Sequence, residues 1–275
     1  MKRTPFIVGL LVLAAQIPLW GYDTSPSSEQ VVPEAIWAAA SGSGTWVTEI
    51  QITSCSQATT DIYVAFCCGD IRELTLHEDL APYHSLRYSN ILAQLQTLDP
   101  AFTYYGRVGA LWFYCSGGGL LQVQAKTVNG DFGKTFPGLN VVAGNSAASG
   151  RPVIIQDIVR SSAYRTSVGV FNSNDSEFTA DFWIIDAAGE TVGSSFSKTI
   201  PAYGFLSFNP FTQAGITSGT YENCLLYVEV SSGASDIYGL MLYGSLANNY
   251  SNDTCALLAK QYGSAASPLP PPFKR

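Results

Sequence analysis

Short stretches in which apolar and polar residues alternate run along almost the whole chain. In "WVTEIQI", four alternate residues from Trp46 to Ile52 would share one face of a strand, and Val47, Glu49 and Gln51 the other. The same alternation recurs in "LQVQAKT" from position 121 and in "LYVEV" from position 226. Because successive side chains of a strand point to opposite faces, this pattern predicts antiparallel sheets with one packed and one solvated face.

Only one stretch has the pattern of a helix. It is "YSNILAQLQTL", which begins at Tyr88 and in which Ser89 or Asn90 could cap the first turn. Everywhere else, clusters of Gly, Ser and Asn end the alternating stretches after a few residues. Frequent turn signals between short strands are typical of an all-β protein.

Four blocks in the first part of the chain recur in the same order about 115 to 120 residues later. The matched blocks are 46–52 with 164–170, "DIYVAF" from Asp61 with "DFWIID" from Asp181, "APYHSLRYS" with "PAYGFLSFN", and "FYCSGG" with "VEVSSG". Alternation alone would align any two strands. It does not require the coincidence of Thr48 with Thr166, or of Tyr83 with Tyr203. The order of the blocks indicates an internal duplication.

Each copy has the size of a β-sandwich. The predicted fold class is therefore all-β, with two tandem, similar antiparallel β-sandwich domains at residues 32–147 and 148–262. Their junction falls in "NVVAGNSAASGRP", whose small residues suit a short connector. Residues 263–275 are Pro-rich and cannot join the interior of a sheet, so we expect an extended or disordered end.

The first residues have the layout of a secretory signal peptide, predicted at residues 1–21. Lys2 and Arg3 precede the apolar stretch "PFIVGLLVLAA", and cleavage could follow Ala14, Ala15 or Gly21. An N-terminal membrane anchor is the alternative, although the stretch is short for a bilayer. No later stretch has the roughly 18 apolar residues of a membrane-spanning helix. We expect a secreted or cell-surface protein without a membrane span in its mature chain.

All six cysteines lie beyond the predicted signal peptide, and an even number in an exported chain suggests disulfides. Cys224 and Cys255 are alone in the second half and are expected to pair. The other four would then pair among themselves; they are Cys55, Cys67, Cys68 and Cys115. A zinc site is disfavoured because the chain lacks a CxxC spacing and because neighbouring strand residues point to opposite faces.

The charge balance excludes one class of partner. The formal net charge is −7, and only 13% of residues are charged. A negative surface repels phosphate backbones, so we expect no binding to nucleic acid.

Reactive groups are sparse, and we predict no catalytic residue, no metal site and no cofactor. The strongest metal alternative places His77, Glu78, Asp79 and His84 on one loop, but loop histidines beside acids are usually solvated. No G-x-S-x-G sequence accompanies the histidines, and the Gly-rich stretches flank strands instead of opening helices. Glu78 or Asp79 with Asp236 could act as a glycosidase pair only across a cleft of suitable width.

Aromatic residues make up 12% of the chain and offer a further hypothesis. Tyr104, Tyr105 and Trp112 could stack against the apolar faces of sugars if they are exposed. Aromatic rings are also the normal filling of a sandwich core, which is the competing interpretation for each of them.

The segments "VVPEAIWAAASGSGTWVTEIQI", "LAPYHSLRYSNILAQL" and "LLQVQAKTVNGDFGKTFPGL" resemble repeat modules of secreted bacterial proteins of undefined role. The "SNDT" at 251–254 is similar to the ending of a last copy, whereas the cysteines and the shortened glycine loops depart from the pattern. The resemblance implies tandem β-sandwiches and carries no active site. We therefore predict a non-catalytic protein with structural, adhesive or protein-interaction roles and a protein or glycan partner. A carbohydrate-binding module is the alternative.

Overall fold

The computed structural model describes residues 24–40, 43–141, 146–148, 150–233 and 239–261. Within these ranges the chain forms antiparallel β-strands and two short helices, which confirms the all-β prediction. The first sheet consists of β1 (Glu29–Ala39), β2 (Thr45–Ser54), β3 (Thr60–Cys67), β4 (Ile71–Leu80), β5 (Ser85–Tyr88), β6 (Arg107–Cys115), β7 (Leu121–Asn129), β8 (Phe132–Pro137) and β9 (Leu139–Asn140). Helix α1 (Ile91–Leu98) lies between β5 and β6.

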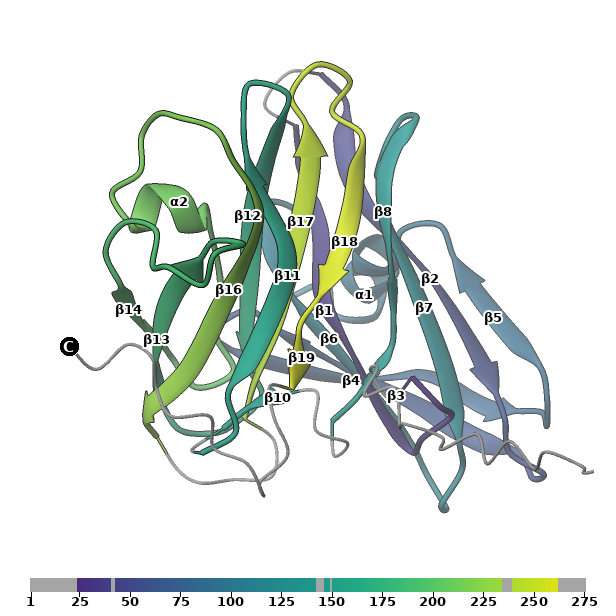
Figure 1. The fold of residues 1–275 in the computed structure, drawn as a ribbon. Helices are drawn as coiled ribbons and strands as arrows, with labels where there is room; N and C mark the ends of the chain where they lie inside the picture. The colour runs from purple at the N-terminus through teal and green to yellow at the C-terminus, as the bar shows by residue number, and fades with distance from the viewer. Residues whose placement is uncertain (1–23, 41–42, 142–145, 149, 234–238, 262–275) are drawn as a thin grey trace, which may run out of the picture.

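The second sheet is built from the second half of the chain. It consists of β10 (Ser146–Ala147), β11 (Val153–Arg160), β12 (Tyr164–Asn172), β13 (Phe178–Ile185), β14 (Phe196–Ile200), β15 (Phe205–Phe208), β16 (Tyr221–Ser232), β17 (Leu240–Asn248), β18 (Thr254–Leu258) and β19 (Lys260–Gln261). Helix α2 (Pro210–Gln213) lies between β15 and β16. Figure 1 shows the two sheets side by side, the first in purple to teal and the second in green to yellow.

Each sheet bends over a hydrophobic core of its own. In the first sheet, the order β4-β3-β6-β1-β2-β7-β8 turns at β1 and β2, which are joined only by the pairs Ala38–Trp46 and Ala39–Thr45. The two flanks thus face each other, with Val64 of β3 and Val123 of β7 in one core. The second half has a separate core that contains Phe182 of β13. This arrangement is consistent with two β-sandwich-like halves.

The two sheets have the same connectivity. The order β14-β13-β16-β11 in the second half repeats β4-β3-β6-β1 in the first. In both halves the second strand pairs with the short strand before the helix and with the long strand that follows later, as β2 does with β5 and β7, and β12 with β15 and β17. Residues 46–52 and 164–170, which align in sequence, lie on the equivalent strands β2 and β12.

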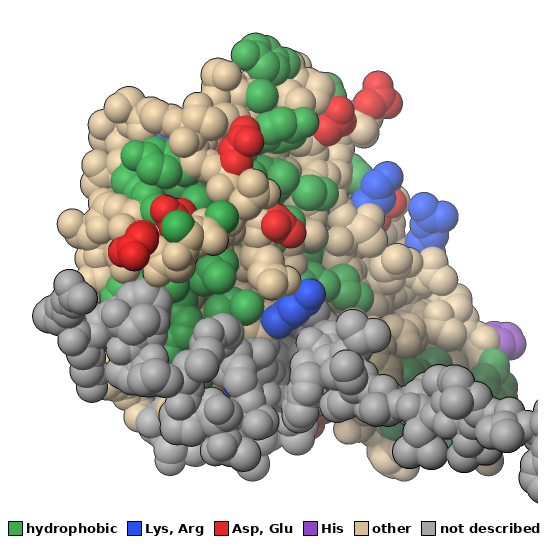
Figure 2. Space-filling view, viewed as in Figure 1, with side chains coloured by type: hydrophobic (Ala, Val, Ile, Leu, Met, Phe, Trp, Pro, Cys, Tyr) green, Lys and Arg blue, Asp and Glu red, His purple; other side chains and the backbone are tan. Residues whose placement is uncertain are grey.

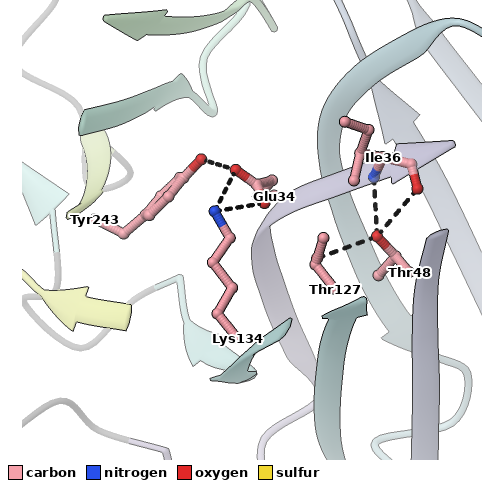
Figure 3. Close-up of polar contacts among 6 residues, drawn as sticks. All are labelled: Glu34, Ile36, Thr48, Thr127, Lys134 and Tyr243. Atoms are coloured by element: carbon pink, nitrogen blue, oxygen red, sulfur yellow. Dashed lines mark hydrogen bonds and ion pairs between the residues drawn. The ribbon is translucent and has the colours of Figure 1, made fainter. Parts of the chain in front are cut away.

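The two matched threonines make the same buried hydrogen bonds. The Thr48 hydroxyl accepts from the Ile36 N–H at 2.9 Å and donates to the Ile36 carbonyl at 3.3 Å (Figure 3). The Thr166 hydroxyl does the same with Val159, at 2.8 and 3.0 Å. Backbone groups inside a protein need a partner, and the hydroxyl supplies one on the neighbouring strand. The hydrogen bonds that these backbone groups need therefore account for the match of Thr48 with Thr166, which alternation does not explain.

The matched tyrosines also have a common structural role. Tyr83 and Tyr203 have positive φ angles of 61° and 50° in the tight turns that precede β5 and β15. A left-handed conformation is uncommon for a residue with a side chain, so its recurrence marks the same turn in both halves.

Strand pairing corrects one of the four sequence alignments. Ile36 and Val159 are equivalent because each is bonded to the matched threonine of its half. Counting along the paired strands from these two residues makes Trp112 and Tyr227 equivalent. Their neighbours on the next strand are Ala65 and Trp183. The alignment of Asp61 with Asp181 is therefore wrong by two residues. A shift of two leaves every side chain on the same face of its strand, so the alternation pattern could not reveal it.

The predicted helix is confirmed as α1, and Asn90 is its N-cap, with its side chain accepting from the Ala93 N–H at 3.2 Å. The equivalent α2 begins after Asn209, which caps it through the Thr212 N–H at 3.1 Å. Neither helix of the described chain is long and apolar enough to cross a membrane. The predicted signal peptide and the Pro-rich end lie outside the described residues.

Candidate functional site

The three aromatic residues proposed as ligand contacts do not lie together on one surface. Tyr104 is fully buried in the first core, where its ring lies 4.7 Å from that of Phe102. Tyr105 is 48% exposed and packs edge-on against Trp37 at 5.3 Å. Trp112 is half-buried on the outer side of β6, next to the second half of the chain. Tyr104 therefore belongs to the core, and Tyr105 is the only one of the three that is exposed, in part.

The predicted disulfides are absent, because all six cysteines are free thiols in the structure. Cys224 is buried in the second core from β16, whereas Cys255 is exposed on β18, so the predicted pair is wrong. Among the other four, Cys67 is buried and Cys55, Cys68 and Cys115 are half-buried. Burial, reinforced by the neighbouring Cys68, raises the pKa of Cys67 to about 12. A thiol with so high a pKa is a poor nucleophile and behaves as a small apolar residue.

The residues of the metal alternative are spread over a strand and a turn. His77 is half-buried near the end of β4, and His84 is exposed after the following turn. Asp79 has a positive φ of 54°, and its N–H donates to the Asp61 carboxylate at 3.0 Å. In the described part of the chain, no group of three His, Cys, Asp or Glu residues could hold a metal ion. Asp236 lies outside the described residues.

The two halves meet in a joint made of two outer sheet faces. The face of β12, β15 and β17 in the second half packs on the face of β1, β3 and β6 in the first. The residues buried there are Val31, Ala65, Cys67, Ala110, Leu139, Val141, Phe171 and Met241. At the rim, the Gly69 N–H donates to the Tyr203 carbonyl at 3.2 Å, and β18 lies beside β8 (Figure 1).

A buried polar network lies at the edge of this joint, formed by Glu34 of β1, Lys134 of β8 and Tyr243 of β17. Figure 3 shows the Lys134 and Tyr243 side chains both pointing at the Glu34 carboxylate. The Lys134 Nζ lies 2.8 Å from Glu34 Oε1 and 3.0 Å from Oε2, and the Tyr243 hydroxyl donates to Oε2. The Lys134 and Glu34 side chains are each 11% exposed, and Tyr243 is fully buried.

In this network the Glu34 charge is balanced by the Lys134 charge. One carboxylate receives an ammonium and a hydroxyl, and the Lys134 Nζ also lies 5.2 Å from the centroid of the Tyr243 ring. Burial and the Glu34 charge raise the pKa of Tyr243 well above its ordinary value, so its hydroxyl keeps its proton. The network therefore ties the two halves through groups that are strongly coupled only when they are desolvated together.

A glycine makes room for the tyrosine. A Cβ on Gly169 of β12 would lie 2.0 Å from Cε1 of Tyr243, its partner across the strands. In the first half the equivalent pair is Gln51 and Gln124, which are both exposed. Where the first half has a solvated amide pair, the second half has a ring packed on bare backbone.

The rest of this outer face is also apolar in the second half and polar in the first. Phe171, Met241 and Phe205 in the second half occupy the positions of Thr53, Gln122 and Ser85 in the first. Sequence reasoning missed this face, although a signal was present in "LMLYG" at 240–244. That run is apolar at every position apart from its glycine, as expected of a strand buried on both sides.

The outer face of β13 and β16 in the second half contributes no side chain to the joint core among the described residues. Trp183 of β13 and Tyr227 of β16 lie 5.6 Å apart on this face, and both are half-buried. Their equivalents in the first half, Ala65 and Trp112, lie at the joint. We call the surface around Trp183 and Tyr227 the distal face. On the side seen in Figure 2, charged side chains are scattered singly and hydrophobic side chains reach the surface between them.

Comparison with known proteins adds no assignment: no protein-family model matches the chain, and no curated protein matches it.

Proposed function

We propose that this protein is a non-catalytic, secreted or cell-surface protein built from two tandem β-sandwich modules, with a structural, adhesive or protein-interaction role. The joint carries this proposal. Its apolar side chains and its buried network hold two copies of one module as a single body. Duplication favours a binding or spacing role, because a repeated module multiplies or separates surfaces, whereas a single reaction needs no second copy.

The distal face is where we expect a protein partner to make contact. The equivalent face of the first half already binds a folded module, namely the second half. An aromatic pair is also the kind of residue that dominates the energy of protein interfaces. Asp181 and Glu229 lie opposite each other on neighbouring strands beside the pair, which favours a partner with Lys or Arg at the rim of its contact surface.

The test compares two matched double variants of the full chain. Trp183→Ser with Tyr227→Ser alters the distal face, and Gln51→Ser with Gln124→Ser alters an exposed cross-strand pair on β2 and β7 of the first half. Each is immobilised and exposed to purified cell-surface proteins in parallel. We expect a bound protein that is retained by the glutamine variant and lost from the aromatic variant. Equal retention by both variants would remove the distal face from the proposal, and turnover of pooled polysaccharide or peptide substrates would contradict a non-catalytic role.

A carbohydrate-binding module is the second candidate, and one observation favours it. Tyr164 and Tyr250 are 40% and 77% exposed at the same end of the second half. Between them, the Arg165 guanidinium donates to the side-chain oxygens of Asn249 at 2.8 Å and Asn252 at 3.4 Å. Exposed rings beside amides suit sugar hydroxyls and sugar faces. A glycan array would show saturable binding that is lost in Tyr250→Ala, whereas the first proposal predicts no glycan-dependent signal.

A further inference from the structure

Two arginines of the first half converge on one aromatic ring. The Cζ atom of Arg72, on β4, lies 4.5 Å from the centroid of the Phe102 ring, and that of Arg107, at the start of β6, lies 5.4 Å from it. Phe102 is only 8% exposed and packs on the buried Tyr104. The two guanidinium groups therefore cover the aromatic end of the first core.

Neither of these two positive charges is neutralised by a carboxylate. Within the described ranges the ion pairs are Lys134–Glu34 and Arg87–Glu49, so no carboxylate oxygen lies within 4.0 Å of either Arg72 or Arg107. Two acids lie in the same neighbourhood. Burial raises the pKa of the Cys68 thiol most, and around it Arg107 and Arg72 lower that pKa while the Asp70 charge raises it. On the pKa of Tyr104, which burial also raises most, Asp99 and Arg72 act in the same opposed way. In a chain with a net charge of −7, two adjacent guanidinium groups without carboxylate partners form a local positive site.

The second half has a different arrangement at this place. Arg107 pairs with Trp37, and the equivalent pair in the second half is Tyr221 with Arg160. There the neutral Tyr221 ring packs on Phe211 at 5.9 Å and closes the same end of the core. Closing the core is thus possible without a cation at the equivalent position, and the paired arginines are a property of the first half alone.

Both arginines are exposed, so their N–H groups can reach an acceptor on a ligand. A guanidinium that lies on a ring uses its flat face, and its N–H groups point outward in the plane. Two such groups on one ring can donate several N–H bonds to a single acceptor group. Oxyanions are the ligands that match this geometry, since they accept paired N–H donors from arginine.

We propose that Arg72 and Arg107 form a binding site for an oxyanion group, a phosphate, sulfate or carboxylate carried by a ligand. The Phe102 ring holds the two guanidinium groups in place, so less side-chain freedom is lost when the anion binds. This site uses no residue of the joint or of the distal face, and it does not depend on the proposed function.

The test is calorimetric titration of the full chain at low ionic strength with three separate probes: inorganic phosphate, sulfate and glucuronate. The three arms distinguish a tetrahedral anion from a carboxylate. Saturable binding with one site per chain is expected for at least one probe. Arg72→Gln and Arg107→Gln should each weaken it about 10- to 100-fold, because each removes charge-assisted hydrogen bonds. Arg87→Gln, at an exposed arginine of β5 that belongs to neither proposed site, should leave it unchanged and serves as the matched control.

A second measurement covers variants that fold poorly. Phenylglyoxal modifies accessible arginines, and mass spectrometry of the native protein should show protection of Arg72 and Arg107 by the bound probe but none of the exposed Arg87. Arg72→Lys with Arg107→Lys keeps the charge and loses the paired donors, so weaker binding by this variant supports the geometry. Heat that is equal for chloride and all three probes, or binding that survives loss of both arginines, would mean an adventitious ion only and would overturn the proposal.

Discussion

The buried network at the joint can be tested by replacing Lys134 with methionine. The substitution keeps the apolar stem and removes the ammonium that lies 2.8 Å and 3.0 Å from the two Glu34 carboxylate oxygens. Glu34 would then remain desolvated, with the Tyr243 hydroxyl as its remaining partner in the network. The carboxylate is 11% exposed, so water can restore little of the lost interaction.

The magnitude follows from this burial. Breaking a buried ion pair by removing one partner costs about 3–5 kcal/mol, since an uncompensated charge stays in the interior. Replacing both partners by neutral groups is far milder. We therefore expect Lys134→Met to lower the free energy of unfolding by about 3–5 kcal/mol, and the double variant Glu34→Gln with Lys134→Met to recover most of that loss.

Urea unfolding followed by tryptophan fluorescence near neutral pH measures both effects. The matched control is Arg87→Met, which breaks the Arg87–Glu49 pair at 3.6 Å, where the Arg87 side chain is 76% exposed. An exposed pair is worth about 1 kcal/mol or less, so this control should hardly move the unfolding midpoint. The reasoning fails if Lys134→Met costs no more than Arg87→Met, or if the double variant is as unstable as the sum of the two single variants.

Four further outcomes are expected. Thr48→Val and Thr166→Val should each cost about 1–3 kcal/mol in urea unfolding, because each leaves backbone groups of the neighbouring strand without their side-chain partner; unequal losses would argue against equivalent roles. Gly169→Ala should cost about 1–3 kcal/mol or more through the clash with Tyr243, whereas Gln51→Ala at the equivalent exposed position should stay within about 0.5 kcal/mol. Because the folded pKa of Tyr243 is raised, its contribution to stability is fully present below about pH 10 and is lost as the pH rises further, so alkaline unfolding should be less steep in Tyr243→Phe. Titration in denaturant without reductant should find six free thiols, and a lower number would show that disulfides form.

The repeat and the strands could be predicted because they depend on local patterns. Alternation places Ile50 and Val168 in equivalent cores whatever the rest of the chain does. The helix cap at Asn90 is likewise a local signal, since its side chain needs only the first turn. The alignment of β3 with β13 was harder to predict, because a shift of two residues leaves the pattern of buried faces unchanged.

The joint could not be predicted in the same way. Glu34, Lys134 and Tyr243 come from three strands that are up to 209 positions apart, and no local pattern brings them together. The cysteine prediction failed for a related reason. An even number of cysteines suggests pairing, but only the fold decides that Cys224 points into a core while Cys255 is exposed on another strand.

The outer faces of the two halves differ, whereas two newly duplicated copies would be identical. The two halves can therefore no longer exchange places. A chain in which the order of the copies was exchanged would present Phe171, Phe205 and Met241 to water and would place Gln51 and Gln124 at the contact between the copies. Such a permuted protein would lose the contact between its halves and would expose an apolar patch that promotes aggregation. Each copy is therefore suited to one position in the chain. An additional copy of the first module would lack the apolar face that packs against a neighbouring module.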